Sequence, residues 1–210
     1  LTDNAGTPAP VSLSVGKNNA TVTHTGTLSG LGSLTKIGTA TQTLSGSNTF
    51  SGGLTISQGA LTASALASLG TAPVVNNATL NLTGGGVNYT GLSSGLSGTG
   101  TVNVTLSTGA SSTYLQGDYS GFTGIWNIGI GAAANAGKAY MTGADNSAAT
   151  INVLSNASLY CNNAGPHYAK LVLKGGNTGE QYGQLRLESN CTWAGPVTLA
   201  GNITSGEDGF

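Results

Sequence analysis

The residues of this sequence that could carry out chemistry are few: seven carboxylates, two histidines and two cysteines in 210 residues. A β-rich polysaccharide lyase gathers several aspartates around calcium, and a glycosidase holds two carboxylates a few ångströms apart. Only Glu188 falls within a strand pattern, whereas Asp118 and Asp145 stand in glycine-rich turns, where turn formation is the ordinary use of aspartate. We therefore predict no catalytic residues and a protein that is not an enzyme.

The histidines and cysteines give no metal-ligand motif. His24 and His167 are far apart, and neither stands at a metal-ligand spacing from a cysteine or an acid, so we expect both at the surface. The glycine-rich stretches lack the lysine or the following helix that a phosphate loop requires. We predict no metal and no cofactor. Cys161 and Cys191 fit a single disulfide of a secreted protein, and they equally fit two small buried residues.

The aromatic residues are unevenly distributed, since ten of the twelve lie from Tyr114 onward. Polysaccharide-binding proteins lay sugar rings on exposed aromatic side chains, while polar side chains reach the hydroxyl groups. We predict an aromatic-poor half, residues 1–113, and a binding half, residues 114–210. The candidate carbohydrate-binding residues are Tyr140, Tyr160, Tyr168, Tyr182, Trp193, Lys170, Arg186 and Glu188.

The elements that must position these residues are short β-strands. Apolar residues recur at alternate positions in brief bursts, such as Val102, Val104 and Leu106, separated by Gly, Asn, Ser and Thr. This period of two is typical of half-buried strands. Residues 62–70 are the only stretch whose pattern allows a helical turn.

The same alternation assigns polar side chains to outer faces. If the leucines at 171 and 173 face the core, Lys170 and Lys174 point outward. By the same logic Gln184, Arg186 and Glu188 face outward beside the leucines at 185 and 187. A polar, hydrogen-bonding face is the expected result.

The strand bursts return at short and imperfectly regular intervals, which favours stacked coils over a sandwich or a barrel. We predict an all-β parallel β-helix that forms one unit over residues 1–210, with Asn, Ser and Thr side chains hydrogen bonded from coil to coil. The separation of Tyr140 and Tyr160 is close to the length of one small coil, so we expect both to point outward on neighbouring coils as an aromatic ladder.

The composition agrees with stacking. Gly, Thr, Ser and Asn make up about half of the chain, and only six residues are basic and seven acidic. Like charges on adjacent coils would lie about 4.8 Å apart and repel. The net charge of −1 without a Lys/Arg cluster argues against nucleic-acid partners, and no apolar run is long enough for membrane insertion.

Residues 32–61 resemble the passenger-associated repeat of autotransporter proteins. The ordered match is Gly-x-Leu-Thr-Lys, then Thr-Leu-Ser-Gly-x-Asn-Thr-aromatic-x-Gly-Gly, then Thr-Ile and Gly-x-Leu. The sequence departs from the family at residues 39–42, where a Gly-Thr-Gly-Thr run is usual. The resemblance implies a right-handed parallel β-helix in an exported bacterial protein, secreted or at the cell surface. The end of the sequence at GNITSGEDGF, in the middle of what reads as another repeat, predicts a chain excised from a longer polypeptide.

The chain as a whole is also similar to the β-helical carbohydrate-binding modules attached to xylanases, although no residue motif carries this second resemblance. It implies a noncatalytic module that binds a plant cell-wall polysaccharide, with xylan favoured, and that recruits an attached catalytic domain. The alternative is a structural passenger, stalk or adhesin segment of a bacterial surface protein.

Overall fold

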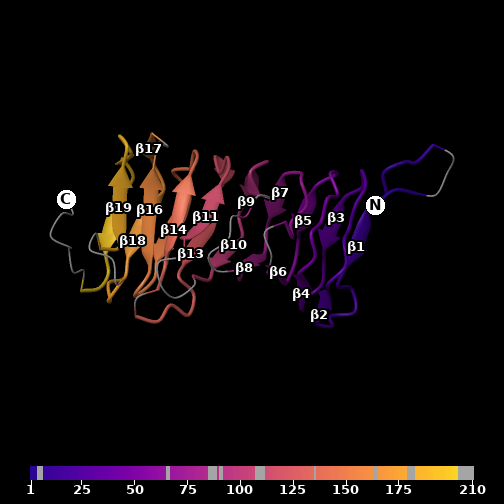
Figure 1. Cartoon of the computed structure of the whole chain (residues 1–210), viewed down its shortest axis with the longest axis horizontal. Helices are drawn as coiled ribbons and strands as arrows, with labels where there is room; N and C mark the ends of the chain where they lie inside the picture. The colour runs from indigo at the N-terminus through magenta and orange to yellow at the C-terminus, as the bar shows by residue number, and fades with distance from the viewer. Residues whose placement is uncertain are drawn as a thin grey trace.

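The computed structural model describes residues 1–3, 7–64, 67–84, 89, 92–106, 112–134, 136–162, 165–178 and 183–202. Within these ranges the chain winds into a parallel β-helix and contains no α-helix. Figure 1 shows the coils following one another along the long axis, from β1 near one end to β18 and β19 near the other. The predicted all-β parallel β-helix is confirmed.

Four sheets form the sides of the coils, and every strand pairing within them is parallel over the described residues. Sheet 1 consists of β1 (Leu13–Val15), β3 (Leu34–Lys36), β5 (Leu54–Ile56), β7 (Val74–Asn76), β9 (Leu96–Gly98) and β12 (Gly121–Phe122). Sheet 2 consists of β2 (Val22–His24), β4 (Thr41–Leu44), β6 (Ala60–Ala63), β8 (Thr79–Leu82), β10 (Thr101–Val104), β13 (Ile125–Ile128), β15 (Thr150–Val153), β18 (Lys170–Leu173) and β21 (Val197–Leu199).

Among the described residues, two further sheets occur, both in the second half of the chain. Sheet 3 consists of β11 (Ser112–Gln116), β14 (Lys138–Thr142), β16 (Ser158–Asn162) and β19 (Leu185–Glu188). Sheet 4 consists of β17 (Pro166–His167) and β20 (Thr192–Trp193). In the part of the chain that the structure describes, the later coils therefore have sides that the first coils lack.

Coil length varies along the chain. The step in sequence from Thr41 to its partner Ala60 on the next coil is shorter than the step from Leu171 to its partner Val197. Sequence distance alone therefore does not tell which residues of neighbouring coils lie side by side.

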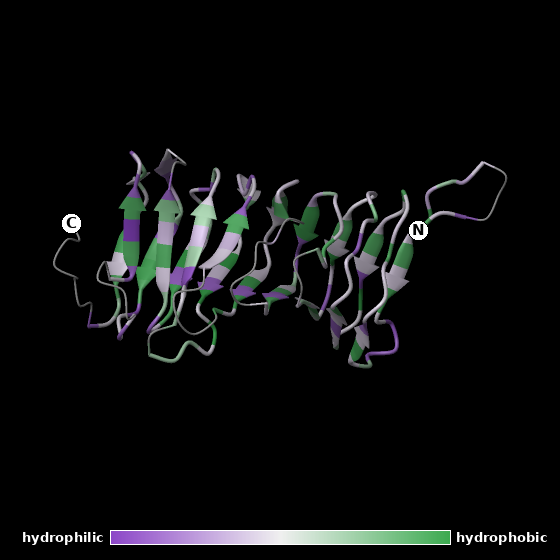
Figure 2. Cartoon of the chain, in the orientation of Figure 1, coloured by the Kyte–Doolittle hydropathy of each residue, from purple (hydrophilic) through white to green (hydrophobic). Residues whose placement is uncertain are grey.

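The core is a set of apolar columns that run along the axis. In sheet 2, successive coils place Leu80, Val102, Trp126, Ile151 and Leu171 in register, and all five are buried. Figure 2 shows the result as hydrophobic bands that alternate with polar bands along the strands. Inward residues of one coil thus pack on inward residues of the next, as the period-two pattern predicts.

An asparagine ladder runs along the outer side of sheet 2. Asn81, Asn103, Asn127 and Asn152 occupy equivalent positions on β8, β10, β13 and β15. Each side-chain amide donates to the side-chain oxygen of the preceding coil at 2.9 Å, from Asn103 through Asn152. This is the hydrogen-bonded stacking that the composition predicts.

Close backbone approach explains part of the glycine content. Gly46 stacks on Gly26 of the preceding coil, and a Cβ atom on Gly46 would lie 2.1 Å from the Gly26 carbonyl oxygen. A Cβ atom on Gly26 would meet only the far end of the His24 side chain, at 3.3 Å. The two stacked glycines therefore differ in how much they tolerate a side chain.

In the stretch 62–70, whose pattern allows a helical turn, strand β6 ends at Ala63 and residues 67–69 form a turn, while residues 65 and 66 lie outside the described part of the chain. One local expectation is corrected. Gln184 does not face outward: it is buried, and its amide nitrogen donates to the carbonyl oxygens of Leu154 and Ala157. It lies just before β19, at a corner where unpaired carbonyl groups need a donor.

The asparagine ladder gives a stability prediction. Asn127→Ala removes two ladder hydrogen bonds, whereas Asn152→Ala removes one, because β18 places Val172 beside Asn152. At about 1 kcal/mol for each net hydrogen bond, we expect losses of about 2 and about 1 kcal/mol. Urea unfolding of both variants measures this difference. Equal losses would contradict the prediction, because the second ladder hydrogen bond of Asn127 would then contribute no stability.

Candidate functional site

The outer face of sheet 3 carries an aromatic column. Strand register places Tyr114, Tyr140, Tyr160 and Arg186 beside one another on four successive coils. The rings of Tyr114 and Tyr140 stack with centroids 4.9 Å apart and planes 23° apart. Tyr114 is 37% exposed and Tyr140 is half-buried. These two rings form the accessible part of the column.

The other end of the aromatic column is buried. Tyr160 is only 4% exposed and meets Tyr140 edge-on, with centroids 4.0 Å apart. Its hydroxyl donates to Glu188, Glu188 pairs with Arg186, and the guanidinium carbon of Arg186 lies 4.8 Å from the Tyr160 ring centroid. Three of the predicted carbohydrate-binding residues therefore contact one another.

The titration of this group follows from these contacts. Burial, with the hydrogen bond to Glu188 and its negative charge, raises the pKa of Tyr160 to about 12. The hydrogen bond from Tyr160 and the positive charge of Arg186 hold the pKa of Glu188 below its usual value. At neutral pH the phenol is thus neutral and the carboxylate is charged.

The remaining predicted residues lie on other sides of the coil. Tyr168 and Lys170 are exposed where the chain passes from sheet 4 to sheet 2. Trp193 is half-buried, and its indole N–H donates to the Ala169 carbonyl oxygen at 3.1 Å. Tyr182 lies outside the described residues. The predicted set is therefore not one continuous surface, and Tyr114, which stacks on Tyr140, is absent from it.

A second cluster occupies the corner between sheets 3 and 4. The Sγ atoms of Cys161 and Cys191 and a ring nitrogen of His167 all lie within 4.8 Å of one another, and all three residues are buried. No disulfide bond joins the two cysteines in this structure. The single disulfide stays a prediction.

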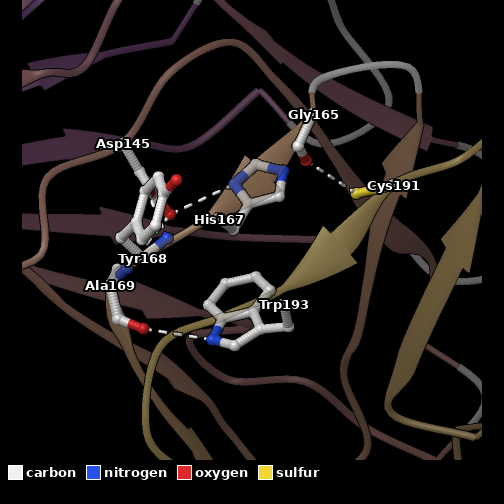
Figure 3. A network of polar contacts seen from close by, with 7 residues as sticks. All are labelled: Asp145, Gly165, His167, Tyr168, Ala169, Cys191 and Trp193. Atoms are coloured by element: carbon white, nitrogen blue, oxygen red, sulfur yellow. Dashed lines mark hydrogen bonds and ion pairs between the residues drawn. The ribbon is translucent and has the colours of Figure 1, made fainter.

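His167 is not a surface residue, which corrects the sequence expectation for it, whereas His24 is exposed. The His167 side chain is 1% exposed because sheet 4 and the neighbouring coils enclose it. Its ring stacks on Trp193 with centroids 5.1 Å apart, and its Nδ1 lies 3.1 Å from Asp145 Oδ2 (Figure 3). Neither sequence spacing nor strand pattern signals this cluster.

Asp145 is the polar centre of that corner. Its oxygens also accept the backbone N–H groups of Tyr168 at 2.8 Å and Ala169 at 3.3 Å. Burial raises the pKa of Asp145, but the hydrogen bond from His167 and these N–H groups lower it by more. Burial likewise lowers the pKa of His167, and the hydrogen bond and charge of Asp145 raise it by more. The pair is thus an ion pair or a strong hydrogen bond.

None of the described carboxylates is arranged as a catalytic pair. Asp3 accepts the backbone N–H of Ala9, and Asp118 accepts that of Ser120. Asp145 and Glu188 are held by the contacts given above. Each described carboxylate thus has a structural partner, in agreement with turn formation as the use of the aspartates.

Lys36 is a buried charge within the first coils. It is 0% exposed, and its ammonium group donates to the carbonyl oxygens of Ile37 at 2.6 Å, Gly38 at 2.8 Å and Gln58 at 3.2 Å. Burial lowers the pKa of Lys36. The side chain therefore joins two coils at a corner by satisfying three carbonyl groups.

Asn48 has the same role at another corner. Its amide nitrogen donates to the Ser68 carbonyl oxygen at 2.6 Å, and its side-chain oxygen accepts the Leu28 N–H at 2.8 Å. One side chain thus connects three successive coils.

Comparison with known proteins identifies the segment that contains both corners. Residues 34–63 match the passenger-associated-transport-repeat family. This part of the chain is therefore similar to the repeats of that family. No curated protein and no solved structure matches the chain. Within the described residues, no helix has the length and apolar character needed to cross a membrane.

The repeat's buried lysine gives a second stability prediction. Lys36→Met keeps most of the apolar volume but leaves three carbonyl groups without their donor, so we expect a loss of about 1.5–3 kcal/mol in chemical denaturation. Lys17→Met, in an exposed turn, is the matched control, with a change of less than about 0.5 kcal/mol.

The difference in stability between the unmodified chain and Lys36→Met should change with pH in a defined direction. Because the folded pKa of Lys36 lies below its ordinary value of 10.5, the unfolded chain binds more protons between the two values. The stability of the unmodified chain relative to Lys36→Met should therefore rise as the pH approaches 10.5. A relative stability that falls over this range would contradict the buried, carbonyl-bound lysine.

Proposed function

We propose that this chain is a structural passenger segment, a stalk, of a bacterial protein that is secreted or displayed at the cell surface. The observation that carries the proposal is the passenger-associated-transport-repeat match at residues 34–63. Such a segment acts through its length and rigidity and carries out no catalysis.

The burial of the repeat's motif residues supports this proposal. Six residues of the motif are enclosed in the coil: Leu34, Lys36, Asn48, Phe50, Leu54 and Ile56 are all buried. They form the core and the corners. A repeat whose motif specifies packing suits a protein that has to extend by adding coils.

The stalk can be tested by surface display. The chain is placed between an epitope and an autotransporter translocation unit in a Gram-negative bacterium, and whole cells are treated with protease. We expect the epitope to reach the surface and the segment to remain intact, because its backbone is hydrogen bonded from coil to coil. Antibody labelling and immunoblotting measure both.

Matched variants separate folding from mere export. Gly46→Ala places a Cβ atom against the Gly26 carbonyl oxygen and should lower the protease-resistant fraction several-fold, whereas Gly26→Ala should leave it unchanged. A flexible Gly/Ser linker of equal length is the degraded control. If the unmodified chain is cleaved as rapidly as that linker, it is not a stalk.

A second candidate function is contact with a polysaccharide at Tyr114 and Tyr140. The observation that favours it is their stacking on the outer face of sheet 3, which produces an aromatic surface longer than either ring. Sugar rings bind such surfaces through their CH faces. Binding of xylan, and a catalytic domain attached to the chain, remain predictions under this candidate.

Affinity electrophoresis distinguishes the two candidates. The chain is run through gels that contain xylan, β-glucan, mannan or pectin. If the second candidate holds, one polysaccharide retards the chain, Tyr140→Ala abolishes the retardation, and Tyr168→Ala, which alters an exposed ring away from sheet 3, preserves it. Unchanged mobility in every gel would remove the glycan candidate and leave the stalk.

A further inference from the structure

The corner between sheets 3 and 4 contains a set of side chains that the stalk does not use. We propose that Cys161, His167 and Cys191 bind one zinc ion that joins two consecutive coils. Cys161 is the last buried residue of β16, and His167 ends β17 of the same coil. Cys191 lies just before β20 of the next coil.

The chemistry and spacing of the three ligands suit zinc. Two thiolates and one imidazole form a common zinc ligand set. The three ligand atoms lie within 4.8 Å of one another. With zinc–sulfur bonds of about 2.3 Å, ligand atoms in a tetrahedral site lie about 3.8 Å apart, so a side-chain adjustment of less than about 1 Å closes the site.

His167 is oriented as a metal-binding histidine. Its Nδ1 is held by Asp145 Oδ2 at 3.1 Å, and its Nε2 is buried without a hydrogen-bond partner among the described residues. Figure 3 shows that second nitrogen on the side of the ring that faces Cys191 and Gly165. A carboxylate on one imidazole nitrogen, which leaves the other for a cation, is the usual outer arrangement of zinc sites.

The surrounding structure fixes the site on three coils. Asp145 comes from the coil before Cys161 and His167, and Trp193 of the coil after them stacks on the imidazole. Ser189 and Asn190 adopt positive φ angles, 51° and 63°, and so turn the chain back toward the corner at Cys191. The ligands are thus supported by packed neighbours.

The charge balance favours Zn²⁺ over Cu⁺, the other cation that suits thiolate and imidazole ligands. Two thiolates and a neutral imidazole compensate Zn²⁺ completely, whereas Cu⁺ would leave one negative charge buried beside the Asp145 carboxylate. The fourth position is available to water or to the Gly165 carbonyl oxygen, which lies 3.8 Å from Cys191 Sγ.

Metal binding changes the protonation of the thiols. The thiolate is the zinc ligand, so each thiol that binds zinc releases its proton to solvent. The alternative, a disulfide, consumes both sulfurs and gives His167 Nε2 no partner.

Cobalt titration tests the site directly. The chain is reduced with a phosphine, stripped of metal with a chelator and titrated with Co²⁺. We expect saturation at one equivalent, a sulfur-to-cobalt charge-transfer band and the strong visible bands of a tetrahedral ion, all lost when one equivalent of Zn²⁺ is added. Zinc should also raise the melting temperature.

Matched variants assign the ligands. Cys161→Ser and Cys191→Ser should each reduce the charge-transfer band, and His167→Gln should weaken binding by roughly 100-fold or more, while His24→Gln, at an exposed histidine, leaves it unchanged. Asp145→Asn should weaken binding by about 10–100-fold. Circular dichroism of each variant confirms that the β-helix is intact.

Four results would overturn the proposal. The reduced chain could show no charge-transfer band at one equivalent of Co²⁺. Binding could survive His167→Gln in a folded chain. Mass spectrometry of the air-purified chain could show the loss of two hydrogens, with no metal bound after reduction, which would identify a structural disulfide instead. Binding of Cu⁺ without binding of Zn²⁺ or Co²⁺ would refute zinc as the ion that this site binds.

Discussion

In-register parallel pairing of each coil on the next is the constraint on which the rest of this structure depends. It brings equivalent residues to about 4.8 Å from one another along the axis, so a residue is favourable where it packs or hydrogen bonds well with the residues at the same position on the neighbouring coils. Leucine and valine satisfy this inside. Asparagine satisfies it outside, since its amide donates to one neighbour and its oxygen accepts from the other. A column of carboxylates would repel, which explains why charged residues are so rare in this chain.

The corners obey a different rule, because there the backbone turns and its carbonyl groups lose their strand partners. Small residues let adjacent coils approach, as at Gly46, and a few buried polar side chains supply the missing donors. Lys36, Asn48 and Gln184 each donate to carbonyl oxygens that lie on another turn or another coil. The strands therefore need only an apolar and a polar face, whereas the corners need particular residues. Two of these, Lys36 and Asn48, belong to the recognisable repeat motif.

This difference decides what could be predicted from the sequence. The strands, the solenoid and the ladder follow from the period of two and from the small polar residues between the bursts. The motif at residues 34–63 identifies individual residues because those coils are nearly uniform, with similar steps between partners. Later steps are longer and uneven, so the stack of Tyr114 on Tyr140 could not be deduced by counting, although the pairing of Tyr140 with Tyr160 could.

The variation in coil length also explains where the aromatic, cysteine and histidine clusters lie in this molecule. Among the described residues, sheets 3 and 4 begin at residue 112, in the part of the chain where several steps between partners are longer than in the first coils. A uniform coil has to repeat its neighbour, which leaves little freedom for a special residue. A coil with an added side gains positions whose neighbours differ, and there Tyr160 can meet Arg186, and two cysteines can meet a histidine that Asp145 orients. The regular half of the solenoid thus supplies length, and the irregular half supplies the side chains on which a binding function could be built.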